Sequence, residues 1–268
     1  MPLLEVFGPP RLWPDEDLVA FSDGLDVGLV LAAYRSGVFP MPLRQAFFSA
    51  SMAWWSPVRR GVLEPGGLRV SRSLRQSAKR YLCTADQAFG AVIRRCADSG
   101  RPGGWIDDGI VRVYEELFAL GHAHSVEAWT ADGRLAGGLY GVNVGGLFAG
   151  ESMFHDQSYG RDASKAALVH LVESCLSAAA SWLLDVQWLT PHLASLGAVA
   201  VSRPDYLRRL GALVDQPPFW PGPAGGAASS PPAGGLAGPE EGFAARLQRL
   251  PGRQQSGSGP EPLTRPGR

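Results

Sequence analysis

Three strand-like segments joined by two tight turns constrain the fold of this chain more than any other feature. The segments span residues 124–129, 135–144 and 147–153. Ala131-Asp132-Gly133 and Gly145-Gly146 separate them, and both sequences are typical of β-hairpin turns. The sequence therefore predicts an antiparallel meander near the middle of the chain.

Helical patterns flank this meander on both sides. Before it we expect a helix at 26–36, with Asp26 as its N-cap and Gly37 as its end. A second is expected at 84–97, where Thr84 is the N-cap and Gln87 completes a capping box. A third is expected at 107–121. After it we expect a helix at 164–181, a strand at 182–187 and short helices at 192–196 and 204–210. This order of elements predicts an α+β fold.

The chain divides into three regions by composition. Residues 1–61 are rich in proline and aromatic residues and predict a small N-terminal lobe, and residues 62–215 hold the regular elements. Residues 216–268 are rich in Gly, Pro, Ser and Ala, a composition that cannot bury enough apolar surface to offset chain entropy. We therefore expect this last region to be disordered.

Charge and composition exclude several classes of protein. The net charge is zero, which argues against bulk binding of polyanions. The chain lacks an apolar run of ~20 residues and a basic leader, so we expect a cytoplasmic protein without a membrane span. The scattered cysteines, and His122 and His124 without companion ligands, predict no metal site.

Residues 59–80 form a local basic segment. Its basic residues are Arg59, Arg60, Arg69, Arg72, Arg75, Lys79 and Arg80, and Glu64 is the acid among them. Arg72, Arg75, Gln76 and Lys79 share one face of an expected helix, while Leu74, Ala78 and Tyr81 line another. We expect Arg72, Arg75, Lys79 and Arg80 to contact nucleic-acid phosphates, with an ordinary solvated helix face as the alternative.

Glu151 is a lone acid in an apolar run that includes Phe148, Met153 and Phe154. A carboxylate in such surroundings is costly to bury unless a cation or a hydrogen-bond donor meets it. We therefore expect Glu151 to bind a ligand, and a solvent-facing glutamate on an edge strand is the alternative.

An ordered series of sequence blocks resembles the leucyl/phenylalanyl-tRNA–protein transferase family. The blocks are Gly37-Val38-Phe39-Pro40, Trp54-Trp55-Ser56-Pro57, Gly104-Trp105-Ile106, and residues 120–127, 138–142, 148–154, 163–168, 184–188, 192–198 and 205–207. The resemblance implies a GNAT-like domain that moves Leu, Phe or Met from aminoacyl-tRNA to the N-terminal amine of proteins beginning with Arg or Lys, which feeds N-end-rule degradation. It implies no cofactor, and we expect a monomer.

Asp185 and Gln187 stand two residues apart on an expected strand, so we expect their side chains on one face. An aminoacyl ester is already activated, and orientation alone can supply about 7–11 kcal/mol. The Gln187 carbonyl can accept a hydrogen bond from the attacking amine, while Asp185 polarises the amide or takes the proton through water. The resemblance implies the same catalytic pair, and Glu151 with Asp185 as the charges that bind the acceptor. A buried Asp–Gln pair that only fixes the strand is the alternative.

The resemblance also implies a donor site. The family positions that wall a pocket for Leu or Phe match Leu139, Phe148, Gly150, Met153, Ser164 and Ala166. Trp105 matches one of the two tryptophans that stack on the terminal adenine, and Met41 stands in place of the other. Either Trp54 or Trp55 compensates for this change, or Met41 packs on the base more weakly.

Two other functions compete with this interpretation. An acetyl-CoA-dependent N-acyltransferase needs a pyrophosphate loop before a helix, and residues 157–162 nearly fit, although the charge of Asp162 opposes a pyrophosphate. A non-enzymatic RNA-binding adaptor would leave Asp185, Gln187 and Glu151 without a role.

Overall fold

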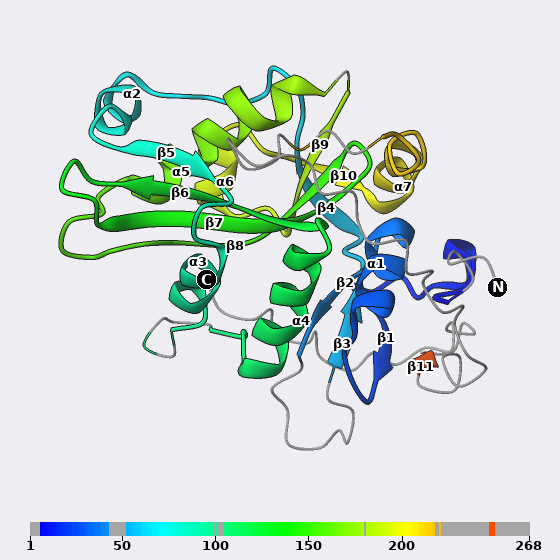
Figure 1. The fold of residues 1–268 in the computed structure, drawn as a ribbon. Helices are drawn as coiled ribbons and strands as arrows, with labels where there is room; N and C mark the ends of the chain where they lie inside the picture. Colours follow the sequence, from blue (N-terminus) through cyan, green and yellow to red (C-terminus); the bar gives the residue numbers. More distant parts are fainter. Residues whose placement is uncertain are drawn as a thin grey trace.

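Two β-sheets with helices packed around them make up the computed structural model (Figure 1), which describes residues 6–42, 52–98, 100, 104–179, 181–217, 220 and 247–249. The elements follow the order predicted from the sequence: helices, an antiparallel meander, a helix, a strand and helices. The predicted α+β class is confirmed. No helix in these ranges is long and apolar enough to cross a membrane.

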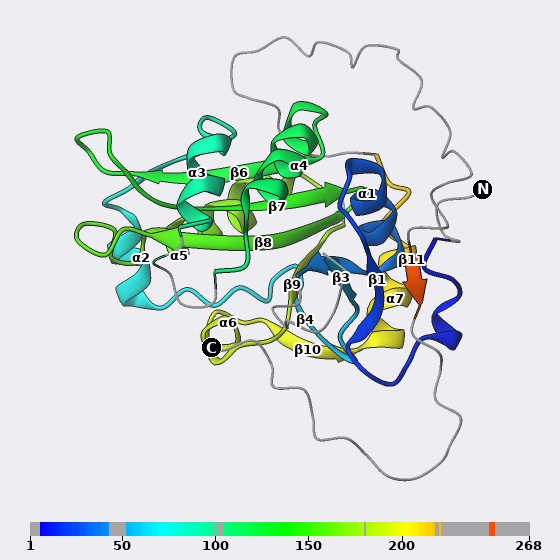
Figure 2. The same cartoon turned by 90° about the horizontal axis from the view of Figure 1, so that it is seen from below.

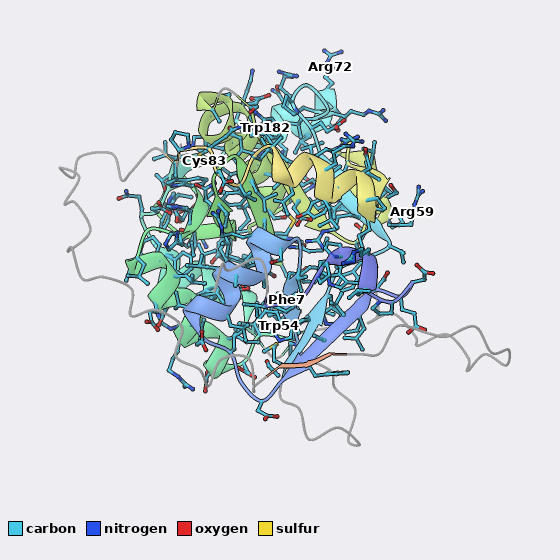
Figure 3. All side chains as sticks on the ribbon, turned by 90° about the vertical axis from the view of Figure 1, so that its right-hand side faces the viewer. Phe7, Trp54, Arg59, Arg72, Cys83 and Trp182 are labelled. Carbon is cyan, nitrogen blue, oxygen red and sulfur yellow. The ribbon has the colours of Figure 1, made fainter. Side chains whose placement is uncertain are left out.

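The smaller sheet has the strand order β11-β1-β3-β2 and is antiparallel throughout. Its strands are β1 (Leu18–Ser22), β2 (Phe39–Met41), β3 (Met52–Trp55) and β11 (Leu247–Arg249). The ring of Trp54 is completely buried and lies 5.3 Å from that of Phe7 (Figure 3). Helix α1 (Val27–Ser36) begins at its predicted cap, where Asp26 accepts a hydrogen bond from the Leu29 amide, and ends at Gly37 with φ 82°.

The larger sheet has the strand order β10-β4-β9-β8-β7-β6-β5. Its strands are β4 (Arg59–Leu63), β5 (Leu82–Ala85), β6 (Ala123–Trp129), β7 (Leu135–Val144), β8 (Leu147–His155), β9 (Leu183–Gln187) and β10 (Val199–Ser202). Only β8 and β9 pair in parallel, and their pairing ends at Ala149 and Asp185. Glu151 and Gln187 therefore lie just beyond the last residues through which β8 and β9 pair with each other.

Helices cover both faces of the larger sheet. In Figures 1 and 2, α1, α3 (Phe89–Cys96) and α4 (Asp108–Ala119) lie on one face, and α2 (Arg72–Ala78), α5 (Ala163–His170) and α6 (Pro191–Ser195) on the other. Helix α7 (Arg203–Gly211) packs near β10 and β4. The predicted helix at 164–181 is regular only to His170 and continues as a π-helical turn and a 3₁₀ turn.

The predicted capping box at Thr84 and Gln87 is wrong. Thr84 lies in β5 opposite Glu127 of β6, and its hydroxyl donates to the Glu127 carboxylate at 2.5 Å. Pairing with β6 extends the strand to Ala85, so α3 begins only at Phe89. Glu127 takes over the capping role, because its carboxylate accepts from the Ala88 amide at 3.3 Å.

Two further expectations concern the ends of the predicted regions. The lobe boundary placed near Gly61 falls inside β4, an inner strand of the larger sheet. Most of the tail predicted to be disordered lies outside the described residues. Within the described residues of the tail, Trp220 packs against the larger domain, and β11 pairs with β1 of the smaller sheet.

Candidate functional site

Asp185 lies at the centre of a buried hydrogen-bond network. Its Oδ1 accepts from Arg60 Nε at 2.8 Å and from the Gln187 amide at 2.9 Å. Its Oδ2 accepts from Arg60 Nη2 at 2.6 Å and from Tyr206 Oη at 2.9 Å. Asp185 and Arg60 are completely buried, so the Asp185 carboxylate is surrounded by groups of the protein itself.

Arg60 belongs to the interior and not to the basic surface that the sequence predicted. Its guanidinium lies between the rings of Phe39 and Tyr206, 4.7 and 4.5 Å from their centroids. Although burial opposes its charge, the Asp185 carboxylate raises the pKa of Arg60 above its ordinary value. A signal for this placement existed in the sequence, because Arg60 and the completely buried Val62 lie two apart on one strand and share a face.

Gln187 adopts a left-handed backbone conformation, with φ 54°. This conformation is unfavourable for a residue with a side chain and is typical of functional sites. The β4–β9 register shifts at the same point, where a Cβ on Gly61 would lie 2.9 Å from the Leu189 amide nitrogen. In this conformation Asp185 accepts from the Gln187 backbone amide, and the Gln187 side chain donates to Glu151.

Glu151 is half-buried, and hydrogen-bonding side chains surround its carboxylate. Tyr114 Oη donates at 3.0 Å and Gln187 Nε2 at 3.1 Å, and Tyr34 Oη lies 3.0 Å from Tyr114 Oη. Burial raises the pKa of Glu151 to about 7, although the hydrogen bonds of Tyr34 and Tyr114 oppose the shift. The alternative of a solvent-facing glutamate on an edge strand is wrong. The sequence pattern identified neither Tyr114 nor Tyr34 as a residue of the site.

The residues predicted to form the donor pocket come from β7, β8 and α5. Leu139, Phe148, Ser164 and Ala166 are buried, and Gly150 and Met153 are half-buried. Leu139 and Phe148 share one apolar cluster, against which Met153 packs. This cluster also contains Ala163 and Ala167 of α5, so these residues gather between that helix and the sheet.

The aromatic residues predicted to hold the adenine differ in their accessibility. Trp105 is half-buried and packs against the apolar cluster that contains Met41. Trp54 is completely buried and donates to Ser22, so it has no face for a base. Trp55 is 8% exposed, donates to the Met41 carbonyl at 2.9 Å and leaves little ring surface for stacking.

The sequence analysis missed Trp188, a half-buried tryptophan next to Gln187. Its ring packs edge-on against Phe39 and Trp55, with centroid distances of 5.0 and 5.7 Å. Its indole nitrogen donates to Asp17 Oδ2 at 2.8 Å. Trp188 directly follows Gln187, and these contacts of its ring fix the end of β9.

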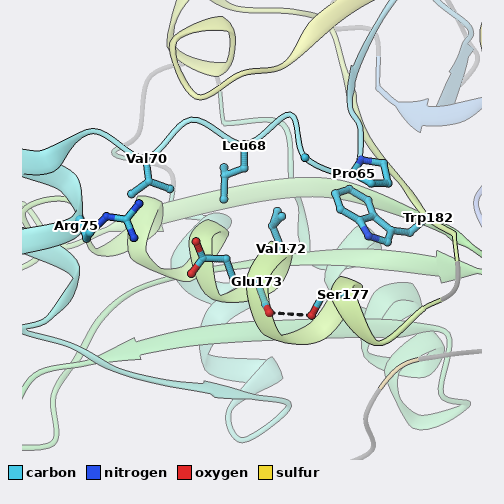
Figure 4. A pocket seen from close by; sticks show the side chains of 9 residues that line it. Pro65, Leu68, Val70, Arg75, Val172, Glu173, Ser177 and Trp182 are labelled. Atoms are coloured by element: carbon cyan, nitrogen blue, oxygen red, sulfur yellow. Dashed lines mark hydrogen bonds between the residues drawn. The ribbon is translucent and has the colours of Figure 1, made fainter.

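The predicted basic residues lie on α2 and on the turn that follows it. Arg72, Arg75, Lys79 and Arg80 are exposed and Leu74 is buried, as the helical pattern predicted. Arg75 also borders a groove of about 460 Å³ between residues 65–70 and the turns after α5, and Trp182 lines the end of the groove beside Pro65 (Figure 4). Within the described ranges, no group of His, Cys, Asp or Glu side chains is arranged to hold a metal ion.

Comparison with known proteins identifies the family. Residues 23–58 match the model of the leucyl/phenylalanyl-tRNA protein transferase N-terminal domain, and residues 62–211 match that of leucyl/phenylalanyl-tRNA protein transferase. A leucyl/phenylalanyl-tRNA–protein transferase of Anaeromyxobacter dehalogenans is 44% identical over 81% of this chain and 91% of its own length. Another, from Rhizorhabdus wittichii, is 47% identical over 69% of this chain and 74% of its own length.

Among solved structures, L-PGS from Bacillus licheniformis matches with a TM-score of 0.38 and 10% identity, and the match covers 59% of this chain and 65% of that one. A similarity of this extent supports no argument about the site. The sequence relatives and both family models agree with the resemblance seen in the sequence blocks. The chain belongs to the leucyl/phenylalanyl-tRNA protein transferase family.

Proposed function

We propose that this site transfers Leu or Phe from aminoacyl-tRNA to the α-amine of proteins that begin with Arg or Lys. The observation that carries the proposal is the placement of Gln187. Its backbone is fixed by a buried carboxylate and its side-chain amide by Glu151. A glutamine whose backbone and side chain are both fixed is suited to orient an amine against an ester.

In the proposed reaction Gln187 orients the attacking amine. Because Gln187 Nε2 donates to Glu151, Gln187 Oε1 is the end of the amide that accepts from the amine. An α-amine has a pKa of about 7.7–8.0, so a useful fraction is neutral near pH 7. A bond forms between this nitrogen and the ester carbonyl carbon, the ester C–O bond breaks, and the proton lost by the amine ends on the ribose hydroxyl.

Asp185 acts in this scheme as a positioning residue. Four donor groups already occupy its two oxygens, so it does not accept the proton of the amine. It holds the Gln187 amide and, with Arg60 and Tyr206, the end of β9. Glu151 is the carboxylate with partial exposure, and we assign it the attraction of the cationic acceptor.

The remaining parts of the proposal follow the sequence prediction. Leu139, Phe148, Gly150, Met153, Ser164 and Ala166 receive the donor side chain, and an apolar pocket of this kind discriminates by only ~1–3 kcal/mol per methylene. Trp105 stacks on the adenine, and Arg72, Arg75, Lys79 and Arg80 contact phosphates. The protein acts in this proposal as a monomer, and a reaction that consumes aminoacyl-tRNA supports a cytoplasmic site of action.

A transfer assay tests the proposal. Purified protein is given labelled leucyl-tRNA, phenylalanyl-tRNA or acetyl-CoA together with a peptide beginning with Arg, or with a matched peptide beginning with Ala. We expect label from both charged tRNAs on the Arg peptide, and loss of several orders of magnitude in turnover for Gln187→Ala. The exposed Gln157 provides the control variant Gln157→Ala, which should transfer normally. Transfer from acetyl-CoA alone would contradict the proposal.

A further inference from the structure

Trp220 packs against the larger domain although it follows the last helix in a Gly- and Pro-rich region. Its ring is stacked on that of Phe148, with centroids 5.2 Å apart and planes 18° apart. It is also stacked on His124, with a centroid distance of 4.3 Å and the same angle. An indole with two such neighbours has a defined orientation.

A buried carboxylate anchors this indole. Trp220 Nε1 donates to Asp86 Oδ2 at 2.7 Å, and His124 Nδ1 lies 2.8 Å from the same oxygen. Asp86 Oδ1 accepts from the Ser125 amide at 2.8 Å. The Asp86 side chain is only 4% exposed, and a carboxylate at that depth is stable only when donors surround it. Trp220 supplies one of these donors, so the hydrogen bond to Asp86 fixes the position of its indole on the domain.

Phe148 connects this anchor to the donor pocket. Phe148 is completely buried, and its ring belongs to the apolar cluster that contains Leu139 and is bordered by Met153 and Trp220. A ring stacked on a fixed indole loses that contact if it tilts. The orientation of the Phe148 ring, and with it the space beside Leu139, therefore depends on Trp220.

We propose that Trp220 is a positioning residue that sets donor selectivity by fixing the ring of Phe148. This inference rests on the proposed function of the pocket. Without the indole, the Phe148 ring tilts and the pocket widens. A leucyl side chain then loses more contact than a phenylalanyl side chain, which is larger and fills the added space.

The test measures kcat and KM for both donors in Trp220→Ala, Trp220→Leu and Trp220→Phe. We expect the ratio of kcat/KM for leucyl-tRNA over phenylalanyl-tRNA to fall about ten-fold in Trp220→Ala, the low end of discrimination by one methylene. Trp220→Leu keeps apolar bulk without a flat face and should show the same fall, even if Trp220→Ala folds poorly. Trp220→Phe restores stacking and should restore most of the ratio.

Trp129 provides the matched control. It is another half-buried tryptophan, and its indole donates to Thr84 at 2.9 Å. Trp129→Phe should leave the donor ratio unchanged. If Trp220→Ala and Trp220→Leu lower the melting temperature but keep the wild-type donor ratio, Trp220 is only structural and the inference is wrong. If the wild-type protein transfers neither donor, the proposed function itself fails.

Discussion

Replacing Glu151 with Gln should stabilise the fold at alkaline pH while it removes acceptor binding. The pKa of Glu151 is raised from 4.5 to about 7, mainly by burial. At 1.36 kcal/mol per pKa unit, ionising this group in the folded protein costs about 3 kcal/mol more than in the unfolded chain. Since Glu151 is partly exposed, solvent reduces this figure, and we expect a measurable gain of about 1–3 kcal/mol.

Proton linkage determines how the stability difference between Glu151→Gln and the wild type depends on pH. Below pH 4.5 the carboxyl group is protonated in both states, so its interactions stabilise the fold fully and the neutral amide of the variant is nearly equivalent to it. As the pH rises towards 7, the unfolded state loses its proton first, and this stability is lost. Glu151→Gln should therefore unfold at the same denaturant concentration as wild type at pH 4 and at a higher one at pH 8.

Although Glu151→Gln should stabilise the fold, it should weaken transfer to the acceptor. A neutral amide does not attract the cationic acceptor, so KM for a peptide beginning with Arg should rise in Glu151→Gln. In the wild type this KM should fall as the pH increases through about 7, where Glu151 ionises. Parallel urea melts and transfer assays at several pH values provide both quantities. Equal stability changes at pH 4 and pH 8, or an unchanged KM, would refute this account of Glu151.

Three further variants test the network and the basic surface. Arg60→Ala leaves the Asp185 carboxylate buried without its cation and should cost about 3–5 kcal/mol in urea denaturation, whereas loss of a surface arginine would cost almost nothing. Gln187→Gly should relax the left-handed backbone and melt at or above the temperature of Gln187→Ala, while both lose transfer activity; a lower melting temperature for the glycine variant would exclude strain at this position. Replacing Arg72, Arg75 and Lys79 together by Gln should weaken tRNA binding and flatten its dependence on salt, and an unchanged salt slope would show an ordinary solvated helix face.

Local sequence patterns predict most of the fold. Alternating apolar residues and Gly-containing turns predict β6, β7 and β8, and the caps Asp26 and Asp107 predict the starts of α1 and α4. The helix start at Thr84 failed because a contact between strands decided it. Glu127, distant in sequence, both pairs with Thr84 and caps α3. Propensity alone does not contain such a contact.

The candidate site depends more strongly on contacts that are distant in sequence. Arg60 stands among surface arginines, and only the fold brings it 2.6 Å from Asp185. Tyr34 and Tyr114 occupy ordinary positions on two helices, yet their hydroxyls meet at Glu151. Trp220 lies in a region of Gly- and Pro-rich composition, and its hydrogen bond to Asp86 could not be inferred from that composition.

The two carboxylates of the site have different environments and therefore different roles. Arg60 compensates the charge of Asp185, and donors occupy both of its oxygens, so this residue can only hold its neighbours. Glu151 has phenol and amide partners but no cation within its described hydrogen bonds, and burial raises its pKa to about 7. A cationic acceptor that binds there would offset the cost of ionising the buried Glu151 carboxyl group. Gln187 joins the two, by its backbone to Asp185 and by its side chain to Glu151, so binding of the acceptor at Glu151 acts directly on the amide that orients the amine.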